Sequence, residues 1–235
     1  MVSGRFAPAL DVLAPQFEQL TGIGVVSALG APESISTRLT GGEAADVIVI
    51  TRPLLDQLAD MGEVRPASRV DLGRSSIGAA VRSGATKPDI GTTEALIGAL
   101  LTAESIGYSA SVSGTYLSTV VFPQLGIWER IRSKSRRIEG EYVGNAVARG
   151  EVELGLQQVS EILAVEGVDY VGPIPNELQS SITYSAGITE RTINIENALR
   201  LVEFLSSDAA AAAIAATGHA SGAEVSLMSA DGVAH

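Results

Sequence analysis

The α/β character of the chain is clearest in residues 38–49, which read Arg38-Leu-Thr-Gly-Gly-Glu43-Ala-Ala-Asp-Val-Ile-Val49. A helix is predicted to end at the paired glycines. Residues 46–50 then read Asp-Val-Ile-Val-Ile, and the apolar residues do not alternate with polar ones, which is typical of a strand buried on both faces. The same order of helix, Gly-Glu pair and buried strand occurs at residues 146–157, Ala146-Val-Ala-Arg-Gly-Glu151-Val-Glu-Leu-Gly-Leu-Gln157. Two α/β lobes of similar topology would produce this similarity, and so would chance.

The flanking segments extend this alternation of helices and strands along the whole chain. Apolar spacing and glycine or proline boundaries predict helices at residues 7–21, 53–61, 93–102, 143–149, 195–205 and 208–217, with another helix starting near Thr115. Strands are predicted at residues 23–28, 46–50, 76–82, 105–109, 154–158, 168–172 and 182–188. Strands separated by helices favour βαβ units and largely parallel sheets.

Composition narrows the classes of function. The chain has 235 residues, of which 46% are hydrophobic and 18% charged, so a sizeable core is expected. Its net charge of −11 argues against nucleic acid or an anionic membrane surface as a partner. No stretch approaches the ~20 apolar residues that a membrane span needs, and we expect no direct membrane insertion.

The chain is poor in metal-binding and nucleophilic side chains. It contains no cysteine and two histidines, His219 and His235. This excludes disulfides, thiolate metal sites and cysteine nucleophiles, and it also excludes a site built from several histidines. We therefore expect neither a metal nor a cofactor. His219 follows a predicted alanine-rich helix and is expected to lie at that helix's end.

Three loops combine small polar residues with the start of a predicted helix, at residues 2–5, 30–34 and 111–115. Each is expected to follow the carboxyl end of a strand, which is the edge where open α/β sheets bind ligands. Helix N-termini and serine hydroxyls suit oxyanions and carboxylates. The alternative is ordinary helix capping, worth about 1 kcal/mol per cap. The candidate ligand-binding residues in these loops are Ser3, Gly4, Arg5, Ser34, Ser111, Ser113 and Gly114.

Three longer patterns carry a family resemblance. They are Ser3-Gly4-x-Phe6-x-Pro8-Ala9-Leu10, Arg38-Leu39-x-x-Gly42-Glu43-x-Ala45-Asp46-Val47 and Ala148-Arg149-Gly150-Glu151-x-Glu153-x-Gly155. In this respect the chain resembles the type 2 periplasmic binding protein fold, specifically the molybdate-binding-protein-like solute receptors. Members hold a small oxyanion with serine hydroxyls and backbone amides. Ser3 matches the first ligand serine of that family, and Ser34 falls in the loop of the second.

The resemblance also implies a domain organisation. It predicts a two-lobed α/β (class II) fold with a ligand cleft between the lobes. Lobe one would comprise residues 1–77 and 182–235, and lobe two residues 78–181. Hinge strands are expected near residues 73–77 and 179–184. Only the last residues of the family's first strand, Met1 and Val2, are present in this sequence.

A second set of motifs resembles a side branch of the family. Tyr108-Ser109-Ala110-Ser111-x-Ser113-Gly114-x-Tyr116, Gly144-x-x-Val147-Ala-Arg-Gly-Glu151 and Gly155-x-Gln157-Gln158-x-Ser160-Glu161 occur together. They are similar to the aconitate isomerases and to receptor-like proteins of the same fold. Gln158 stands where molybdate receptors carry a ligand tyrosine. The resemblance adds Gly144 and Gln158 to the candidate ligand-binding residues.

The residue types themselves favour a carboxylate. Gln157 and Gln158 point to opposite sides of their strand, so at most one of them faces a ligand. A glutamine amide both donates and accepts, which suits a carboxylic acid better than a bare tetrahedral oxyanion. Arg5 could bind a carboxylate through two parallel hydrogen bonds, and Arg38 and Arg52 are weaker candidates.

Three functions follow as expectations. The first is capture of a small anion, a di- or tricarboxylate, with the membrane component of an ABC transporter as a candidate partner. The second is an isomerase that moves an allylic proton on a tricarboxylate. It would need a base, for which Tyr116, Glu33 and Glu141 are candidates without an assignment. The third is molybdate or tungstate binding, which Gln158 disfavours.

The start of the sequence bears on localisation. Residues 1–5 contain neither the basic nor the apolar region of a secretory leader. The protein is expected to be periplasmic if a leader has been removed, and cytoplasmic if the chain is complete as given.

Overall fold

The computed structural model describes residues 1–221, which divide into two compact units. Unit 1 contains Met1–Arg74 and the chain from Ile182 onward, and unit 2 contains Ser75–Ser181. Residues 75–77, which we expected in lobe one, therefore belong to unit 2. The chain passes from one unit to the other at these two boundaries.

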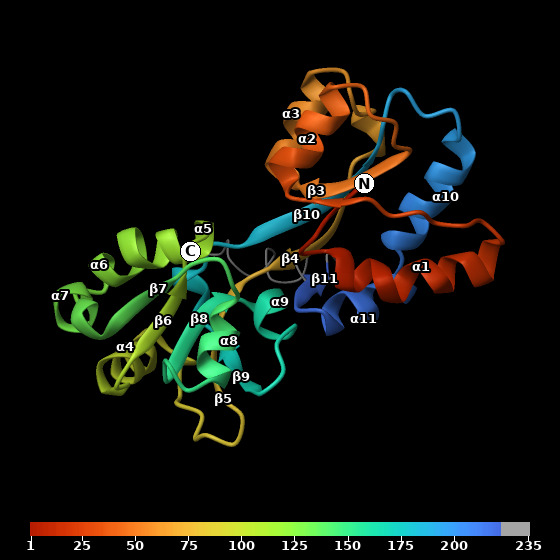
Figure 1. The fold of residues 1–235 in the computed structure, drawn as a ribbon. Coiled ribbons are helices and arrows are strands. Elements are labelled where there is room, and N and C mark those ends of the chain that lie inside the picture. The colour runs from red at the N-terminus through yellow and green to blue at the C-terminus, as the bar shows by residue number, and fades with distance from the viewer. Residues whose placement is uncertain (222–235) are drawn as a thin grey trace, which may run out of the picture. The chain divides into compact units, whose positions relative to one another are not determined.

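Unit 1 is built on a mixed six-stranded sheet (Figure 1). Its strands, in spatial order, are β11 (His219–Ser221), β4 (Val70–Ser75), β10 (Ile182–Ile188), β3 (Val47–Thr51), β1 (Val2–Ser3) and β2 (Leu29–Gly30). β1 runs parallel to both β2 and β3, whereas β10 is antiparallel to β3. The expected parallel arrangement thus holds for only part of the sheet.

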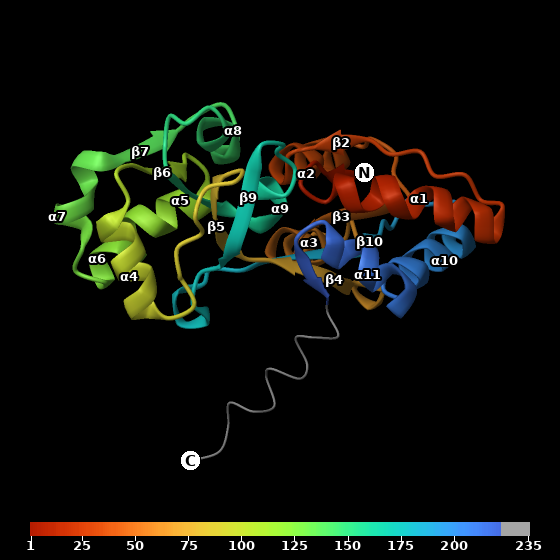
Figure 2. The same ribbon diagram turned by 90° about the horizontal axis from the view of Figure 1, so that it is seen from below.

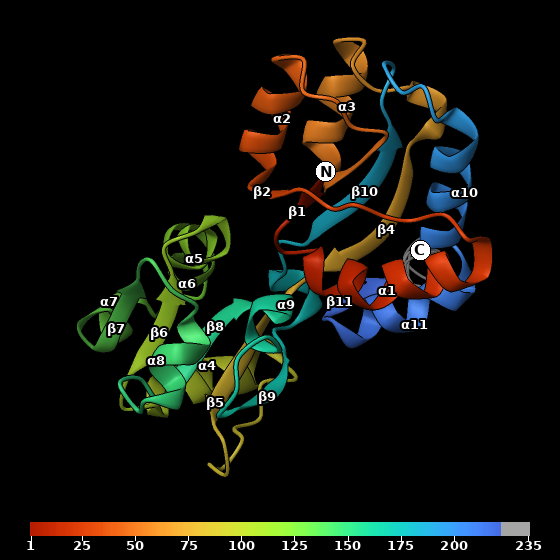
Figure 3. The same ribbon diagram turned by 45° about the vertical axis from the view of Figure 1, so that its right-hand side comes forward.

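Helices cover both faces of this sheet. They are α1 (Ala7–Thr21), α2 (Pro32–Thr40), α3 (Arg52–Asp60), α10 (Ile195–Leu205) and α11 (Asp208–Ala216), with a 3-10 turn at Pro66–Ser68. Figure 3 shows α2 beside α3 and, elsewhere in the unit, α1 near α10 and α11. Val47 and Val49 of β3 pack in the core with α1, α10 and α11, while Ile48 and Ile50 pack with α2 and α3. Burial of β3 on both faces explains its uninterrupted apolar sequence.

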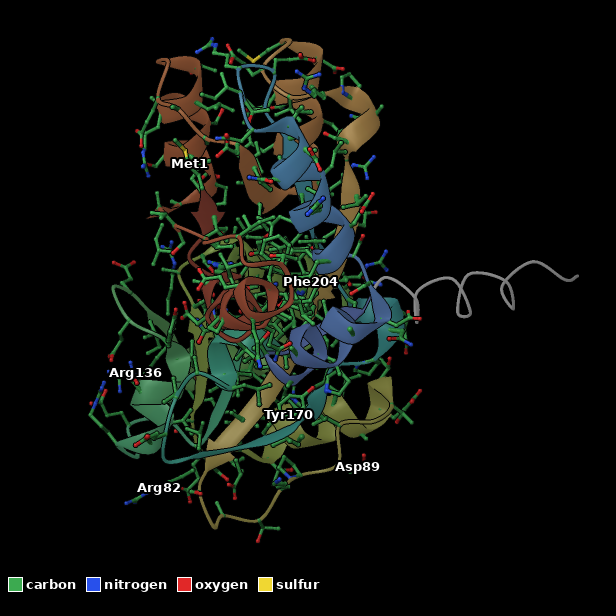
Figure 4. All side chains as sticks on the ribbon, turned by 90° about the vertical axis from the view of Figure 1, so that its right-hand side faces the viewer. Met1, Arg82, Asp89, Arg136, Tyr170 and Phe204 are labelled. Carbon is green, nitrogen blue, oxygen red and sulfur yellow. The ribbon has the colours of Figure 1, made fainter. Side chains whose placement is uncertain are left out.

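The helices of unit 1 are joined by direct side-chain contacts. Figure 4 shows Phe204 of α10 close to α1. The ring centroids of Phe204 and Phe17, a residue of α1, are 5.5 Å apart. Each such contact adds apolar burial, which is the main stabilising contribution in a cysteine-free chain.

Unit 2 is built on a mixed five-stranded sheet. In spatial order its strands are β7 (Ser135–Ile138), β6 (Ile106–Ser109), β8 (Leu154–Gln158), β5 (Ile77–Arg82) and β9 (Val168–Pro173). β6 is parallel to β7 and β8, whereas β5 is antiparallel to β8 and β9. This sheet, too, is only partly parallel.

The helices of unit 2 are α4 (Thr93–Thr102), α5 (Val112–Tyr116), α6 (Phe122–Gln124), α7 (Trp128–Ile131), α8 (Val143–Ala148) and α9 (Val159–Ile162), with 3-10 turns at Arg132–Lys134 and Asn176–Leu178. A π-helical segment, Leu117–Val121, joins α5 to α6. Figure 2 shows α4 and α6 on one side of the sheet and α8 on the other. α8 lies close to β8 because Gly155 has no side chain: a Cβ there would be 2.6 Å from Val147.

Several predicted elements differ from the structure. Residues 23–28, predicted as a strand, form no strand: the Ala28 carbonyl accepts from the N–H of Val2 at 2.9 Å, and strand pairing with β1 begins only at Leu29. The helix expected near Thr115 begins at Val112. His219 begins β11 instead of ending a helix. None of the helices within residues 1–221 has the length and apolar character that a membrane crossing requires.

Candidate functional site

In unit 1 the candidate site begins with Ser3 at the carboxyl end of β1. Ser3 pairs with Gly30 of β2, and the N–H of Phe6 donates to the Ser3 carbonyl at 2.9 Å, which turns the chain into α1. The Ser3 side chain is 1% exposed, and within residues 1–221 its hydroxyl has no hydrogen-bond partner. A buried hydroxyl without a partner is uncommon and retains its full capacity to bind a ligand.

The other candidates of unit 1 follow the same edge of the sheet. Gly4 is exposed and donates its N–H to the Gly30 carbonyl at 3.1 Å, which ties the β1–α1 loop to the end of β2. Arg5 comes next and is half-buried. Ser34 is exposed in the first turn of α2, a helix whose N-cap, Ala31, contributes no side-chain hydrogen bond. The start of α2 therefore leaves backbone N–H groups open at this edge.

The two weaker arginine candidates are committed to ion pairs. Arg38 donates to Glu43 at 2.7 Å. Arg52 donates to Asp56 at 2.9 Å and to Asp71 at 2.8 Å. Both guanidinium groups thus serve local structure in unit 1.

In unit 2 three serine hydroxyls form a closed triangle, called here the serine triangle: Ser109, Ser111 and Ser113. The Oγ–Oγ distances are 2.8 Å for Ser109–Ser111, 3.1 Å for Ser109–Ser113 and 3.3 Å for Ser111–Ser113. Ser109 ends β6, and the other two lie at the start of α5. Each hydroxyl hydrogen can rotate outward, so the cluster can offer neutral donors to an anion without rearranging heavy atoms.

Gly114 allows the triangle to form. A side chain at this position would overlap the carbonyl oxygen of Ser109, and its Cβ would lie 2.6 Å from the carbonyl carbon of that residue. Only glycine lets the start of α5 pack this closely on the end of β6. Gly114 therefore shapes the site through its backbone, at the position that the sequence motif indicates.

Gln158 and Gly144 face the interior of unit 2. With its amide NH2 directed toward Ser75, Gln158 donates to Ser75 Oγ at 2.8 Å and to the carbonyls of Ser75 and Ser76 at 3.2 Å. Gly144 is buried, and a Cβ there would lie 3.1 Å from Val165. The donors of Gln158 are thus used within unit 2, whereas ligand contact by Gly144 stays a prediction. Gln157 is also engaged, because its Oε1 accepts from the N–H of Val143 at 2.6 Å.

This role for Gln158 can be measured. Gln158→Ala removes the donors that satisfy Ser75 and Ser76, so the free energy of unfolding should fall by about 3 kcal/mol. The exposed Gln124→Ala variant serves as the control and should change by less than about 0.5 kcal/mol. Urea denaturation followed by circular dichroism provides both values. An unchanged midpoint for Gln158→Ala would mean that its amide does not support the fold.

Glu141 and Tyr116, the candidate bases of unit 2, make no hydrogen bond to the serine triangle within residues 1–221. Two hydrogen bonds from Arg149, at 2.7 and 2.9 Å, hold the pKa of Glu141 below its usual range. Tyr116 packs on the core of unit 2, and Glu33 is exposed in the first turn of α2. The described part of the chain also contains no group of three or more acidic, histidine or cysteine side chains placed to hold a metal ion.

Ser109 is the functional candidate that sequence reasoning left out of its set. It belongs to the quoted motif, and its spacing from Ser111 and Ser113 was the available signal. The spacing of Ser109, two and four positions before Ser111 and Ser113, does not by itself show that the three hydroxyls meet. The close approach of α5 to the backbone of Ser109 at Gly114 brings the three hydroxyls together.

Comparisons with known proteins agree with this architecture. Residues 1–220 match the family described as bacterial extracellular solute-binding protein. An aconitate isomerase from a Pseudomonas species is 41% identical over 221 residues, covering 92% of this chain and 84% of that protein. The molybdate-binding protein ModA of Escherichia coli (strain K12) is 25% identical over 190 residues, covering 77% and 73%.

A solved structure shows the same fold. The substrate-binding domain of a putative molybdenum ABC transporter from Clostridium difficile superposes with a TM-score of 0.81 at 15% identity, covering 94% of this chain and 96% of that one. The expected type 2 periplasmic-binding-protein-like α/β fold is thereby confirmed.

Proposed function

Because this chain belongs to the bacterial extracellular solute-binding protein family, we propose that it binds a small carboxylate anion of the di- or tricarboxylate class. The serine triangle is the observation that carries this proposal. Its three hydroxyls lie within 3.3 Å of one another at a strand–helix junction, and Ser109 and Ser113 are buried. Neutral donors in a water-poor site bind an anion while leaving it free to dissociate.

Within unit 1, Ser3 is proposed to donate to an anion through its hydroxyl, because its buried oxygen lacks a partner within residues 1–221. Gly4, Arg5 and Ser34 share its edge of the sheet and are proposed to take part in anion binding there. The chain's net charge of −11 does not prevent anion binding, since exposed charges are screened within ~8 Å at physiological salt.

The choice of carboxylate over molybdate rests on the relatives. The 41% identical protein is named for aconitate, a tricarboxylate, whereas the molybdate-binding relative is 25% identical. Gln158 cannot support this choice, because its amide donors are used by Ser75 and Ser76. We keep molybdate or tungstate binding as the outcome that would contradict the proposal.

The same relative favours a second candidate function, an aconitate-type isomerase. Such an enzyme moves a proton between two carbons that are allylic to carboxylates. One base must take the proton and return it, while hydroxyl donors stabilise the enolate-like charge. The serine triangle could provide these hydroxyl donors. Reversible binding is preferred, because Arg149 engages Glu141, and neither Glu141 nor Tyr116 makes a hydrogen bond to the triangle within residues 1–221.

For a binding protein we also propose a location and a partner. A receptor of this family would work in the periplasm and deliver its ligand to the membrane component of an ABC transporter. The segments near residues 73–77 and 179–184, where the chain passes between units, are proposed as its hinge.

A thermal-shift panel tests the ligand class. It contains molybdate, sulfate, citrate, cis-aconitate and trans-aconitate. A carboxylate at about 100 times its Kd should add about 2.7 kcal/mol to the free energy of unfolding. Ser113→Ala should weaken that ligand about tenfold, since one hydrogen bond to a charged group is lost. Ser133→Ala, on an exposed serine of the same unit, is the matched control. A response to molybdate alone would refute the proposal.

Proton NMR in deuterated buffer separates the two candidate functions. A ligand that binds but keeps both its covalent structure and its allylic protons supports a receptor. Exchange of its allylic protons, or conversion between cis- and trans-aconitate, would instead establish the isomerase.

A further inference from the structure

The β6–α5 loop, which carries the serine triangle, is attached to the neighbouring strand β7. The two strands run parallel and side by side (Figure 3), so their carboxyl ends lie at the same edge of the sheet. Ala110, between Ser109 and Ser111, donates its N–H to the Ile138 carbonyl at 2.9 Å. The Ala110 carbonyl accepts from Nη2 of Arg137 at 3.2 Å. The Arg137 guanidinium is therefore held against the residue that joins two members of the triangle.

Arg137 is the cation that unit 2 places at this loop. Among residues 75–181, no other lysine or arginine side chain makes a hydrogen bond or ion pair with residues 109–113. Arg149 donates instead to two glutamates and Lys134 to two backbone carbonyls, none of them in this loop. Within unit 2, charge compensation for an anion at the triangle therefore falls to Arg137.

The protein uses few of the hydrogen-bond donors of Arg137. A guanidinium carries five N–H donors. The bond to Ala110 uses one, and the other polar contact within unit 2 is an ion pair in which Nη1 lies 3.5 Å from Glu139 Oε1. The side chains of that pair are 53% and 71% exposed, so solvent screens the pair and it stabilises the fold little. Arg137 can therefore exchange Glu139 for a ligand while the bond to Ala110 keeps its guanidinium at the loop.

The serine triangle and Arg137 differ in charge and suit different parts of a ligand. The triangle offers neutral hydroxyl donors to one carboxylate. A di- or tricarboxylate brings further negative charge, and a guanidinium binds a carboxylate through two parallel hydrogen bonds. We propose that Arg137 is a specificity-determining residue, which binds the second carboxylate of the ligand. This role rests on the proposed function, and it selects di- and tricarboxylates over monocarboxylates and inorganic oxyanions.

Two anions that differ in their number of carboxylates test this role. trans-Aconitate carries three, and crotonate keeps the double bond but has one. NMR titration of the full chain gives the Kd of each, and the parent should bind trans-aconitate about tenfold or more tightly than crotonate. Arg137→Ala should weaken trans-aconitate about tenfold and change crotonate by less than about twofold, because only the second carboxylate loses its partner. Raising the ionic strength should weaken trans-aconitate more in the parent than in Arg137→Ala.

Arg132→Ala is the matched control. It removes an exposed arginine of the same unit whose ion-pair partner is Glu129, and it should leave both affinities unchanged. Equal weakening of both anions by Arg137→Ala would mean that Arg137 only positions the loop, and unchanged binding of trans-aconitate would remove it from the site. Either result overturns the inference while the proposed function stands. A parent protein that binds no carboxylate would instead refute the proposed function and this role with it.

Discussion

Gly114→Ala, which adds one methyl group beside the serine triangle, is expected to be strongly destabilising. The new Cβ would overlap the Ser109 carbonyl oxygen and lie 2.6 Å from its carbonyl carbon. These atoms are backbone at the end of β6, so neither side can move without displacing a strand or a helix. The free energy of unfolding should fall by about 3 kcal/mol or more. Urea denaturation followed by circular dichroism measures this loss.

Gly98→Ala is the matched control for this variant. Gly98 lies in α4 of the same unit, and a Cβ there meets nothing within 4 Å. Alanine should stabilise this exposed helix position by about 0.5–1 kcal/mol. If the free energy of unfolding falls for Gly114→Ala and rises for Gly98→Ala, close packing at Gly114, and not backbone flexibility, causes the loss. A Gly114→Ala protein as stable as the parent would mean that α5 does not need to approach Ser109.

The helices that the sequence predicted best have strong signals at both ends. α1 covers residues 7–21 as predicted, because Gly22 ends it with φ 71°. α4 covers residues 93–102 as predicted, and Thr92 caps it by accepting from the N–H of Ala95. β3 was found from an apolar run that reflects burial on both faces. Where local chemistry and packing agree, the sequence is sufficient to locate an element.

Elements with weak local signals were missed. β7 contains Arg136 and Arg137, both exposed, and Figure 4 shows Arg136 directed outward from unit 2. Charged side chains are common on a strand at the edge of a sheet, and β7 is the first strand of its sheet. Such a strand is defined by its pairing with β6, which no local pattern encodes.

The candidate site residues show a different limit of prediction from sequence. Alternation along β8 correctly predicts that Gln157 and Gln158 point to opposite sides. It cannot show that both sides are occupied, one by the start of α8 and the other by Ser75 and Ser76. Donor capacity can be read from a residue type, but the partner that uses it is chosen by tertiary packing. The serine triangle was partly found because its members are close in sequence.

The placement of His219 leads to a prediction about acid stability. Its side chain is 1% exposed and packs against Phe6 and Tyr184, with ring centroids 5.3 Å from each. Nδ1 is 3.2 Å from the Thr217 hydroxyl, and Nε2 has no partner within residues 1–221. Burial lowers the pKa of His219 from 6.5 to about 4, because a charged imidazole would lose its hydration among these rings.

This pKa sets the direction of the pH effect. As the pH falls through about 6.5, the unfolded chain takes up a proton at His219 while the folded chain does not, until the pH reaches about 4. The unfolded state is therefore favoured progressively across this window. Across it, His219 should cost about 3 kcal/mol of stability, and below it this residue causes no further loss.

His219→Phe isolates this contribution, because phenylalanine preserves the aromatic packing and cannot take up a proton. Urea unfolding of both proteins should be compared at several pH values between about 7 and 4. The carboxylates affect both proteins alike, so the difference between their free energies of unfolding reports His219 alone. That difference should shift in favour of His219→Phe by about 3 kcal/mol over the window. Parallel curves would show that His219 is already hydrated or charged in the folded protein, and that its orphaned Nε2 has a partner in solution.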